Sequence, residues 1–189
     1  IGANAFYNCS SWEGELYLPE NLENIGAAAF SGCSSLTGDV KIPSNLKEIS
    51  GSVFSGCSSL NGNIILNDVV EKIGSSAFSG CSGITGSLEL AESLTEIGSS
   101  AFRGCSGITG KLVLSGKIKT ISANAFSSTG IEELEIKDGV GSVGDKAFKD
   151  CIQLQKAVIA DSVTKLGEQA FRGCEALQEI VLPVSASYG

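Results

Sequence analysis

The chain repeats every 22 to 24 residues, and this period constrains its fold more than any other feature. The repeats form eight rows, which span residues 1–24, 25–48, 49–72, 73–96, 97–120, 121–142, 143–165 and 166–189. A row this short cannot bury its own apolar face, but stacked rows bury a shared one. We therefore expect a single solenoid domain over residues 1–189.

Two residue types fall almost entirely into single columns of this repeat. Every Phe and every Cys occupies its own phase of the row, and only row six lacks the cysteine, where Thr129 takes its place. The columns are Phe6, Phe30, Phe54, Phe78, Phe102, Phe126, Phe148 and Phe171, and Cys9, Cys33, Cys57, Cys81, Cys105, Cys151 and Cys174. Such regularity predicts that equivalent side chains of successive rows pack on one another.

Each row also indicates its local structure. Triplets such as Leu88-Glu89-Leu90 alternate apolar and polar residues, as a half-buried strand does. The Ala-Phe pair fits a short helical turn, which ends at a Gly, Asn or Asp that tolerates a positive φ. Stacking then gives a parallel strand ladder with short helical turns.

The first five rows carry one inserted residue beside a glycine, just before the strand. These glycines are Gly14, Gly38, Gly62, Gly86 and Gly110. An insertion marked by glycine predicts a bulge at the start of the strand. Because the later rows lack it, we expect the solenoid to change curvature near residue 121.

Two neighbouring columns alternate in charge from row to row. One contains Glu23, Lys47 and Glu71, and the next contains Glu48, Lys72 and Glu96. Opposite charges on adjacent strands stabilise the pair, whereas like charges destabilise it. The alternation predicts that the rows stack in register.

The repeat resembles a known family. Row four, Ile73-Gly74-Ser75-Ser76-Ala77-Phe78-Ser79-Gly80-Cys81, is similar to the BspA-type leucine-rich repeat, also called the Treponema pallidum type. Row six, with Phe126-Ser127-Ser128-Thr129-Gly130-Ile131, resembles the variant in which Thr-Gly replaces the cysteine. The resemblance covers essentially the whole chain. It implies a right-handed leucine-rich-repeat solenoid in secreted or cell-surface proteins that are discussed as adhesins and host-interaction proteins, and it supplies no catalytic residues.

Composition argues against several classes of function. The net charge is −8, whereas phosphate backbones and anionic membrane surfaces attract basic patches. No apolar run approaches the roughly 20 residues that span a bilayer. The chain has no histidine, so Ser-His-Asp and Cys-His nucleophile systems and mixed Cys/His zinc sites cannot form. We expect no enzyme, no cofactor and no metal.

The cysteines are better explained as packing groups than as a reactive site. Stacking would bring neighbouring Cα atoms to about 5 Å, within disulfide range, although parallel side-chain directions make closure awkward. A ladder of buried thiols that behave as small apolar groups is the main expectation. A zinc or redox site is the alternative.

The outward residue of each triplet defines the candidate binding face. These residues are Tyr17, Lys41, Ile65, Glu89, Val113, Glu135, Val158 and Val181. Exposed apolar surface often marks an interaction site, and Tyr17 and Ile65 are the candidate anchors. The alternative is that branched side chains merely suit any strand position.

The leading functional hypothesis is a non-catalytic protein-binding module of a bacterial surface or secreted protein, active in adhesion or host interaction. The alternatives are a structural spacer and a glycan-binding module. Glycan recognition needs exposed aromatic platforms, yet the chain has one Trp and three Tyr, and Trp12 lies in the core leucine column. Neither end carries a polar capping unit, so we expect a fragment of a longer protein. The sequence leaves the oligomeric state open.

Overall fold

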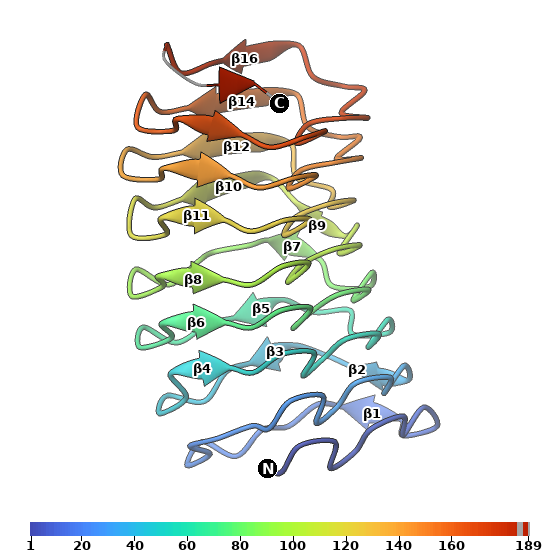
Figure 1. The fold of residues 1–189 in the computed structure, drawn as a ribbon. Helices are drawn as coiled ribbons and strands as arrows, with labels where there is room; N and C mark the ends of the chain where they lie inside the picture. Colours follow the sequence, from blue (N-terminus) through green and yellow to red (C-terminus); the bar gives the residue numbers. More distant parts are fainter. Residues whose placement is uncertain (185–186, 189) are drawn as a thin grey trace.

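The computed structural model describes residues 1–184 and 187–188 as a stack of similar turns around one axis (Figure 1). The two ends of the chain lie at opposite ends of the stack. All strands are short and all pairings between them are parallel. Within the described residues, no helix has the length and apolarity needed to cross a membrane. The solenoid is built from two columns of strands, with the apolar side chains packed between them.

The first face carries the predicted leucine triplets. Its strands are β1 (Gly14–Glu15), β2 (Leu36–Thr37), β3 (Val40–Lys41), β5 (Ile64–Ile65), β7 (Gly86–Ser87), β9 (Ile108–Thr109), β10 (Lys111–Leu114), β12 (Glu133–Ile136), β14 (Lys156–Ile159) and β16 (Glu179–Val181). They do not form one ladder. Three two-stranded sheets, β1-β2, β3-β5 and β7-β9, precede one four-stranded sheet, β10-β12-β14-β16.

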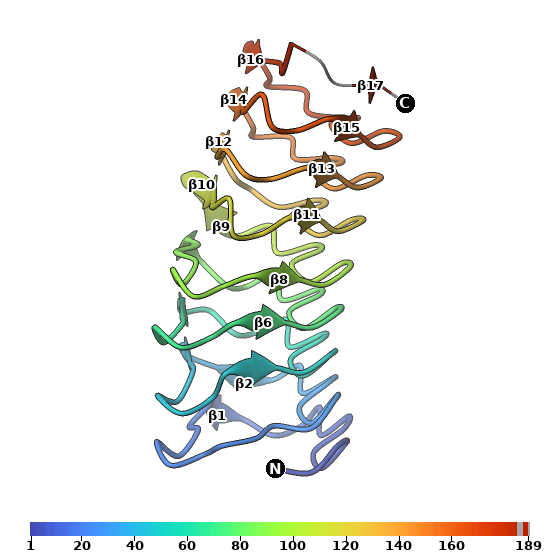
Figure 2. The same cartoon turned by 60° about the vertical axis from the view of Figure 1, so that its left-hand side comes forward.

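The second face adds a column of strands at the row starts. It consists of β4 (Glu48–Ile49), β6 (Lys72–Ile73), β8 (Glu96–Ile97), β11 (Thr120–Ile121), β13 (Ser142–Val143), β15 (Lys165–Leu166) and β17 (Ser187–Tyr188). These strands form two sheets, β4-β6-β8 and β11-β13-β15-β17. Figure 2 separates the two columns, with β12 and β14 in one and β13 and β15 in the other.

The predicted short helical turns are wrong. The described residues contain no helix. In row four, Ser76 has a φ of 56° and Gly80 a φ of 76°, and every row has this pair of positive φ values. Two left-handed residues four apart prevent the run of negative φ that a helix needs. Each row instead forms tight turns whose N–H groups donate alternately to the next row, as Phe78 N does to Ala101 O at 2.8 Å, and within the row, as Ala77 N does to Gly74 O at 3.2 Å. The predicted left-handed end of the turn at the glycine column is confirmed.

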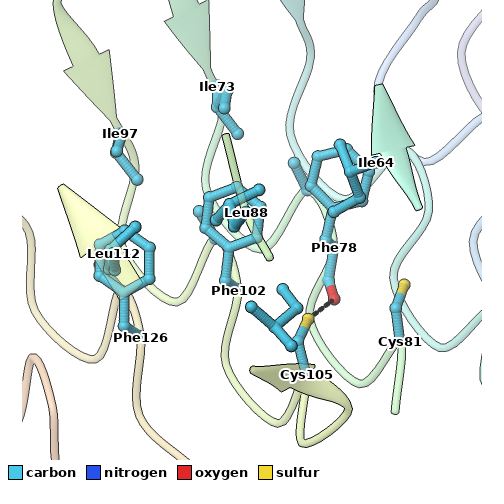
Figure 3. Packing of buried hydrophobic residues seen from close by; sticks show 14 of the residues in the cluster. Ile64, Ile73, Phe78, Cys81, Leu88, Ile97, Phe102, Cys105, Leu112 and Phe126 are labelled. Carbon is cyan, nitrogen blue, oxygen red and sulfur yellow. Dashed lines mark hydrogen bonds between the residues drawn. The ribbon is translucent and has the colours of Figure 1, made fainter. Parts of the chain in front are cut away.

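The core is a stack of phenylalanine rings that runs through all eight rows. Centroids of successive rings lie 5.2 to 5.7 Å apart, with nearly parallel planes. Figure 3 shows Phe78, Phe102 and Phe126 side by side in three consecutive rows. These three rings are fully buried, whereas Phe6 at the first row is 37% exposed. The eight stacked rings therefore make seven steps from row to row.

The thiols form the second core column, as predicted, and they also make hydrogen bonds. Each buried thiol donates to the phenylalanine carbonyl of the preceding row, as Cys105 does to Phe78 O at 3.0 Å (Figure 3). The thiol therefore satisfies a carbonyl that a purely apolar side chain would leave without this bond. All seven cysteines are free, with Cys9 exposed and Cys174 partly buried. Burial raises the pKa of Cys57 and of Cys105 to about 12.

A glycine column on the second face decides where its sheets break. A Cβ on Gly98 would lie 2.4 Å from the backbone nitrogen of Ser75 in the preceding row. Side chains cannot approach that closely, so glycine permits the bond from Gly98 N to Ile73 O at 2.8 Å. Two rows have serine in this column, Ser50 and Ser122. The sheet β4-β6-β8 begins in the row of Ser50 and ends just before the row of Ser122.

The charge columns confirm stacking in register. Glu48 lies opposite Lys72, and Lys72 opposite Glu96. The Lys72 ammonium lies 3.2 Å from the Glu96 carboxylate, and Lys47 lies 3.9 Å from Glu71 in the neighbouring column. These pairs are solvent-exposed, so they fix register more than they stabilise the fold.

Candidate functional site

The structure places the predicted face residues in two groups. In the continuous sheet, Val113 lies opposite Glu135, Glu135 opposite Val158, and Val158 opposite Val181. In the earlier rows, Lys41 lies opposite Ile65. Tyr17 is 80% exposed, Ile65 43% and Val181 48%, and Lys41 and Glu89 are also exposed. Val113, Glu135 and Val158 are half-buried, because side chains of adjacent paired strands cover one another.

Two charges of this face are neutralised by neighbours. The Lys111 ammonium lies 2.6 Å from the Glu135 carboxylate, and Lys41 lies 3.0 Å from Glu20. The hydrogen bond from Lys111 lowers the pKa of Glu135, and the same bond raises the pKa of Lys111. Glu89 has no ion pair within the described chain. It is therefore the one charged member of the face column that is left for an external partner.

After β7, which pairs with β9, the ladder of the first face is open on both sides of row four at residues 88–90. β5 pairs only with β3, β10 pairs only with β12, and residues 88–90 belong to no strand. In the paired rows two and three, Ile42 N donates to Ile65 O at 2.9 Å. The corresponding N–H groups of Leu66 and Leu90 make no backbone hydrogen bond to another described residue. Row four thus presents backbone groups that a continuous sheet would have paired.

Two adjoining hollows lie where the ladder is open. One has a volume of about 420 Å³, and its lining includes Glu89, Glu92, Lys111, Val113 and Lys137. The other, of about 280 Å³, is lined by Asn63, Ile64, Ile65, Leu66, Ser87 and Glu89. Ser87 and Glu89 border both hollows. We call the two together the row-four groove.

The interruption lies beside two of the inserted glycines. Gly86 has a φ of 80° and Gly110 a φ of 72°, a conformation that interrupts a strand. The strands around them pair across a shifted register, since Gly86 lies opposite Ile108, which precedes Gly110. The later rows, which lack the insertion, form strands of three or four residues. The predicted bulge is thus present, and strand pairing changes at β10.

Part of this site was not predictable from the row pattern. The outward column is visible in the sequence, but the groove arises because two neighbouring ladders fail to close. The inserted glycines marked the rows concerned without indicating which pairings would be lost. Trp12 lies in the leucine column, as predicted, but in the first row it is not buried. It is 41% exposed, and its ring lies 5.2 Å from Phe6 and 6.2 Å from Phe30 at the first row.

The described residues contain no group of three or more acidic, cysteine or histidine side chains that could hold a metal ion. The thiols follow a line through the core, each hydrogen-bonded to a carbonyl of the preceding row, rather than converging on one point. What the arrangement offers on its surface is shape, apolar contact and backbone hydrogen bonding.

A stack of parallel strands with one leucine triplet per turn defines the chain as a leucine-rich-repeat β-solenoid, a class that typically serves as a binding scaffold. A profile of the BspA type leucine rich repeat region matches it in six copies, over residues 1–129 and 108–188. The chain belongs to this BspA-type leucine-rich repeat family.

Solved structures share the fold. A leucine-rich repeat protein of Treponema pallidum superposes with a TM-score of 0.67 at 27% identity, covering 94% of this chain and 71% of that one. A leucine-rich repeat protein of Bacteroides ovatus superposes with a TM-score of 0.52 at 22% identity, covering 100% of this chain and 77% of that one. A comparison with curated proteins found no significant match.

Proposed function

We propose that the chain is a non-catalytic protein-binding module of a cell-surface or secreted bacterial protein, which engages a host extracellular protein through its first face. The observation that carries the proposal is the row-four groove. It lies among exposed face residues and combines the apolar side chains of Ile65 and Val113 with the unpaired carboxylate of Glu89. The placement at the surface rests on the family, whose members are secreted or surface proteins discussed as adhesins and host-interaction proteins.

The face residues suit a protein partner better than a sugar. Protein interfaces combine apolar anchors with a polar rim, and Tyr17 and Ile65 supply the anchors here. Lys41, which is held by Glu20, makes the rim at this end of the face polar. A spacer that only separates other domains would have no use for an exposed apolar column on one face.

A binding screen with purified extracellular host proteins and a glycan panel tests the proposal. The test variant changes Tyr17, Ile65 and Val113 to Glu. The matched control changes Tyr7, Val69 and Ile152 to Glu, because these are exposed apolar side chains outside the face column. Specific protein binding that the test variant loses and the control keeps would support the proposal. Binding that both variants retain would move the site elsewhere, and an absence of binding by the folded chain would favour the spacer.

A further inference from the structure

The row-four groove combines apolar surface with backbone groups that the interrupted ladder leaves unpaired. Leu66 N and Leu90 N lack the row-to-row bond that Ile42 N makes. Glu89 O, which would accept from Leu66 N in a closed ladder, also makes no bond within the described residues. These groups face the two hollows, where they can hydrogen-bond the backbone of another chain.

The side chains around these groups restrict what such a chain can carry. Ile65 lies on one side of Glu89 and Val113 on the other, one row away in each direction. The carboxylates of Glu89 and Glu92 form the row-four wall of the larger hollow. Lys111 on the opposite wall is occupied by Glu135 at 2.6 Å. Lys137 also lines this hollow, but Glu89 has no ion pair within the described residues and borders both hollows, so it presents a negative charge to a partner.

We propose that the groove binds an extended peptide segment of a partner protein, which places a Lys or Arg on Glu89 and apolar side chains on Ile65 and Val113. The backbone of the segment hydrogen-bonds the groups that the open ladder leaves unpaired at Leu66, Glu89 and Leu90. Alternation within the segment follows from its extended form, since every second side chain points to the same surface. The net charge of −8 favours the approach of a basic segment. This inference rests on the proposed function and specifies its partner.

The segment lies over the groove and reaches the unpaired backbone groups through the two hollows, rather than inserting as a strand between the rows. The row starts remain joined across the second face, where Lys72 pairs with Glu48 on one side and Glu96 on the other. Gly98 N also holds Ile73 O at 2.8 Å. Rows three, four and five therefore cannot separate by the width of a further strand.

Synthetic peptides provide the test. The probe alternates valine and threonine about a central lysine. One twin has a central glutamate, and a second keeps the lysine but is N-methylated at alternate backbone nitrogens. Binding is measured by fluorescence anisotropy on the complete chain and on the variants Glu89→Gln, Glu89→Lys and Glu48→Gln. Glu48 is the matched control, an exposed carboxylate on the second face. Circular dichroism establishes that each variant is folded.

We expect the lysine peptide to bind the wild-type chain and Glu89→Gln to weaken it about fivefold, as for an exposed ion pair. Glu89→Lys should prefer the glutamate peptide, and Glu48→Gln should behave as wild type. N-methylation should weaken binding about tenfold or more, because backbone hydrogen bonds are lost. Unchanged binding by Glu89→Gln and Glu89→Lys, equal binding of the N-methylated twin, or no binding of the lysine peptide would overturn the inference.

The two proposals can fail separately. Host-protein binding that the Tyr17, Ile65 and Val113 variant loses, without any peptide binding, would leave the function standing and remove this inference. Binding of the lysine peptide that depends on Glu89, without capture of any screened protein, would support the groove and exclude the partners tested. The absence of both would remove both proposals.

Discussion

Up to residue 110 the first face is divided into three two-stranded sheets, whereas from β10 onward it is a single sheet of four strands. The two regions have the same core. Phe78 and Phe102 stack at 5.3 Å in the first region, and Phe126 and Phe148 stack at 5.6 Å in the second. The comparison shows that stacking and ladder closure are separate properties. The apolar columns fix the stacking of the turns throughout, whereas strand pairing on the first face is divided among the rows that carry the inserted residue and is continuous only from β10 onward.

On the second face, too, the core stacks continuously while the strand pairing is interrupted. Its sheets break at Ser50 and Ser122, where the other rows have glycine. A single Cβ is enough, because the backbones of adjacent rows approach more closely at this column than a side chain allows. The core nevertheless passes both breaks without interruption, as the buried Phe54 and Phe126 of these two rows indicate. The row-four groove is therefore a local feature of the surface and not a boundary between domains.

We expect the largest loss of folding stability at alkaline pH, and we expect it to arise mainly in the first region, because that region holds more of the buried thiols. Burial raises the pKa of Cys57 and of Cys105 from 9.0 to about 12. Between these values the unfolded thiols ionise and the folded ones do not. The contribution of these neutral thiols to the free energy of unfolding is therefore fully present below pH 9. It is lost as pH rises towards 12, by about 4 kcal/mol for each of the two thiols.

Denaturant unfolding at several pH values between 8 and 11 measures this loss. The double variant Cys57→Ala, Cys105→Ala should be less stable at pH 8 but should show a shallower decline above pH 9. The slope should fall by about 1.4 kcal/mol per pH unit for each thiol removed. An identical slope in the wild type and the variant would show that other groups control the alkaline transition.

Removal of a central ring tests whether the shared core unites the two regions. Phe102 is fully buried and stacks on Phe78 at 5.3 Å and on Phe126 at 5.4 Å, at the junction of the regions. Phe102→Ala should lower the free energy of unfolding by about 3–5 kcal/mol through the cavity it leaves. Phe6→Ala, at the exposed first row, is the matched control and should cost much less. Two separate unfolding transitions in the wild-type chain would contradict a single cooperative core.

Gly98→Ala should reproduce in an intact sheet the break that serine makes elsewhere. The added Cβ would lie 2.4 Å from Ser75 N, so rows four and five must separate locally. We expect a loss of about 1–3 kcal/mol, the usual cost of overpacking, and faster hydrogen exchange at the Gly98 amide, which now donates to Ile73 O. Normal stability with full protection of this amide would show that the close approach is not required.

The converse change, Ser122→Gly, should have the smallest effect. It permits the residue 122 amide to approach Ile97 O, which now accepts from the Ser122 hydroxyl at 2.7 Å. The new backbone bond offsets the entropic cost of glycine, so the net change should stay within about 1 kcal/mol. The readout is amide hydrogen exchange at residue 122, which should slow if β8 and β11 join. Unchanged exchange would mean that another contact keeps the two sheets apart.

The repeat by itself determined the class of fold and the position of almost every core residue. Phenylalanine and cysteine recur at one phase of each row, and such periodicity has one physical solution, the stacking of equivalent turns. The charge columns fixed the register for the same reason, since Lys72 is compatible with Glu48 and Glu96 only when it lies between them. The outward column of the candidate face followed from the alternation of the leucine triplets.

Only the tertiary structure decided which strands pair, how each turn is shaped and where the groove lies. The Ala-Phe turns are not helical because every second N–H group bonds to the next row, an arrangement that depends on a neighbour distant in sequence. The thiol-to-carbonyl bonds depend on the preceding row in the same way. The groove exists because rows three to five pair incompletely around Glu89. A row pattern encodes what each turn must bury, whereas the closure of a ladder depends on how closely two backbones can approach, and that is settled only when the rows are stacked.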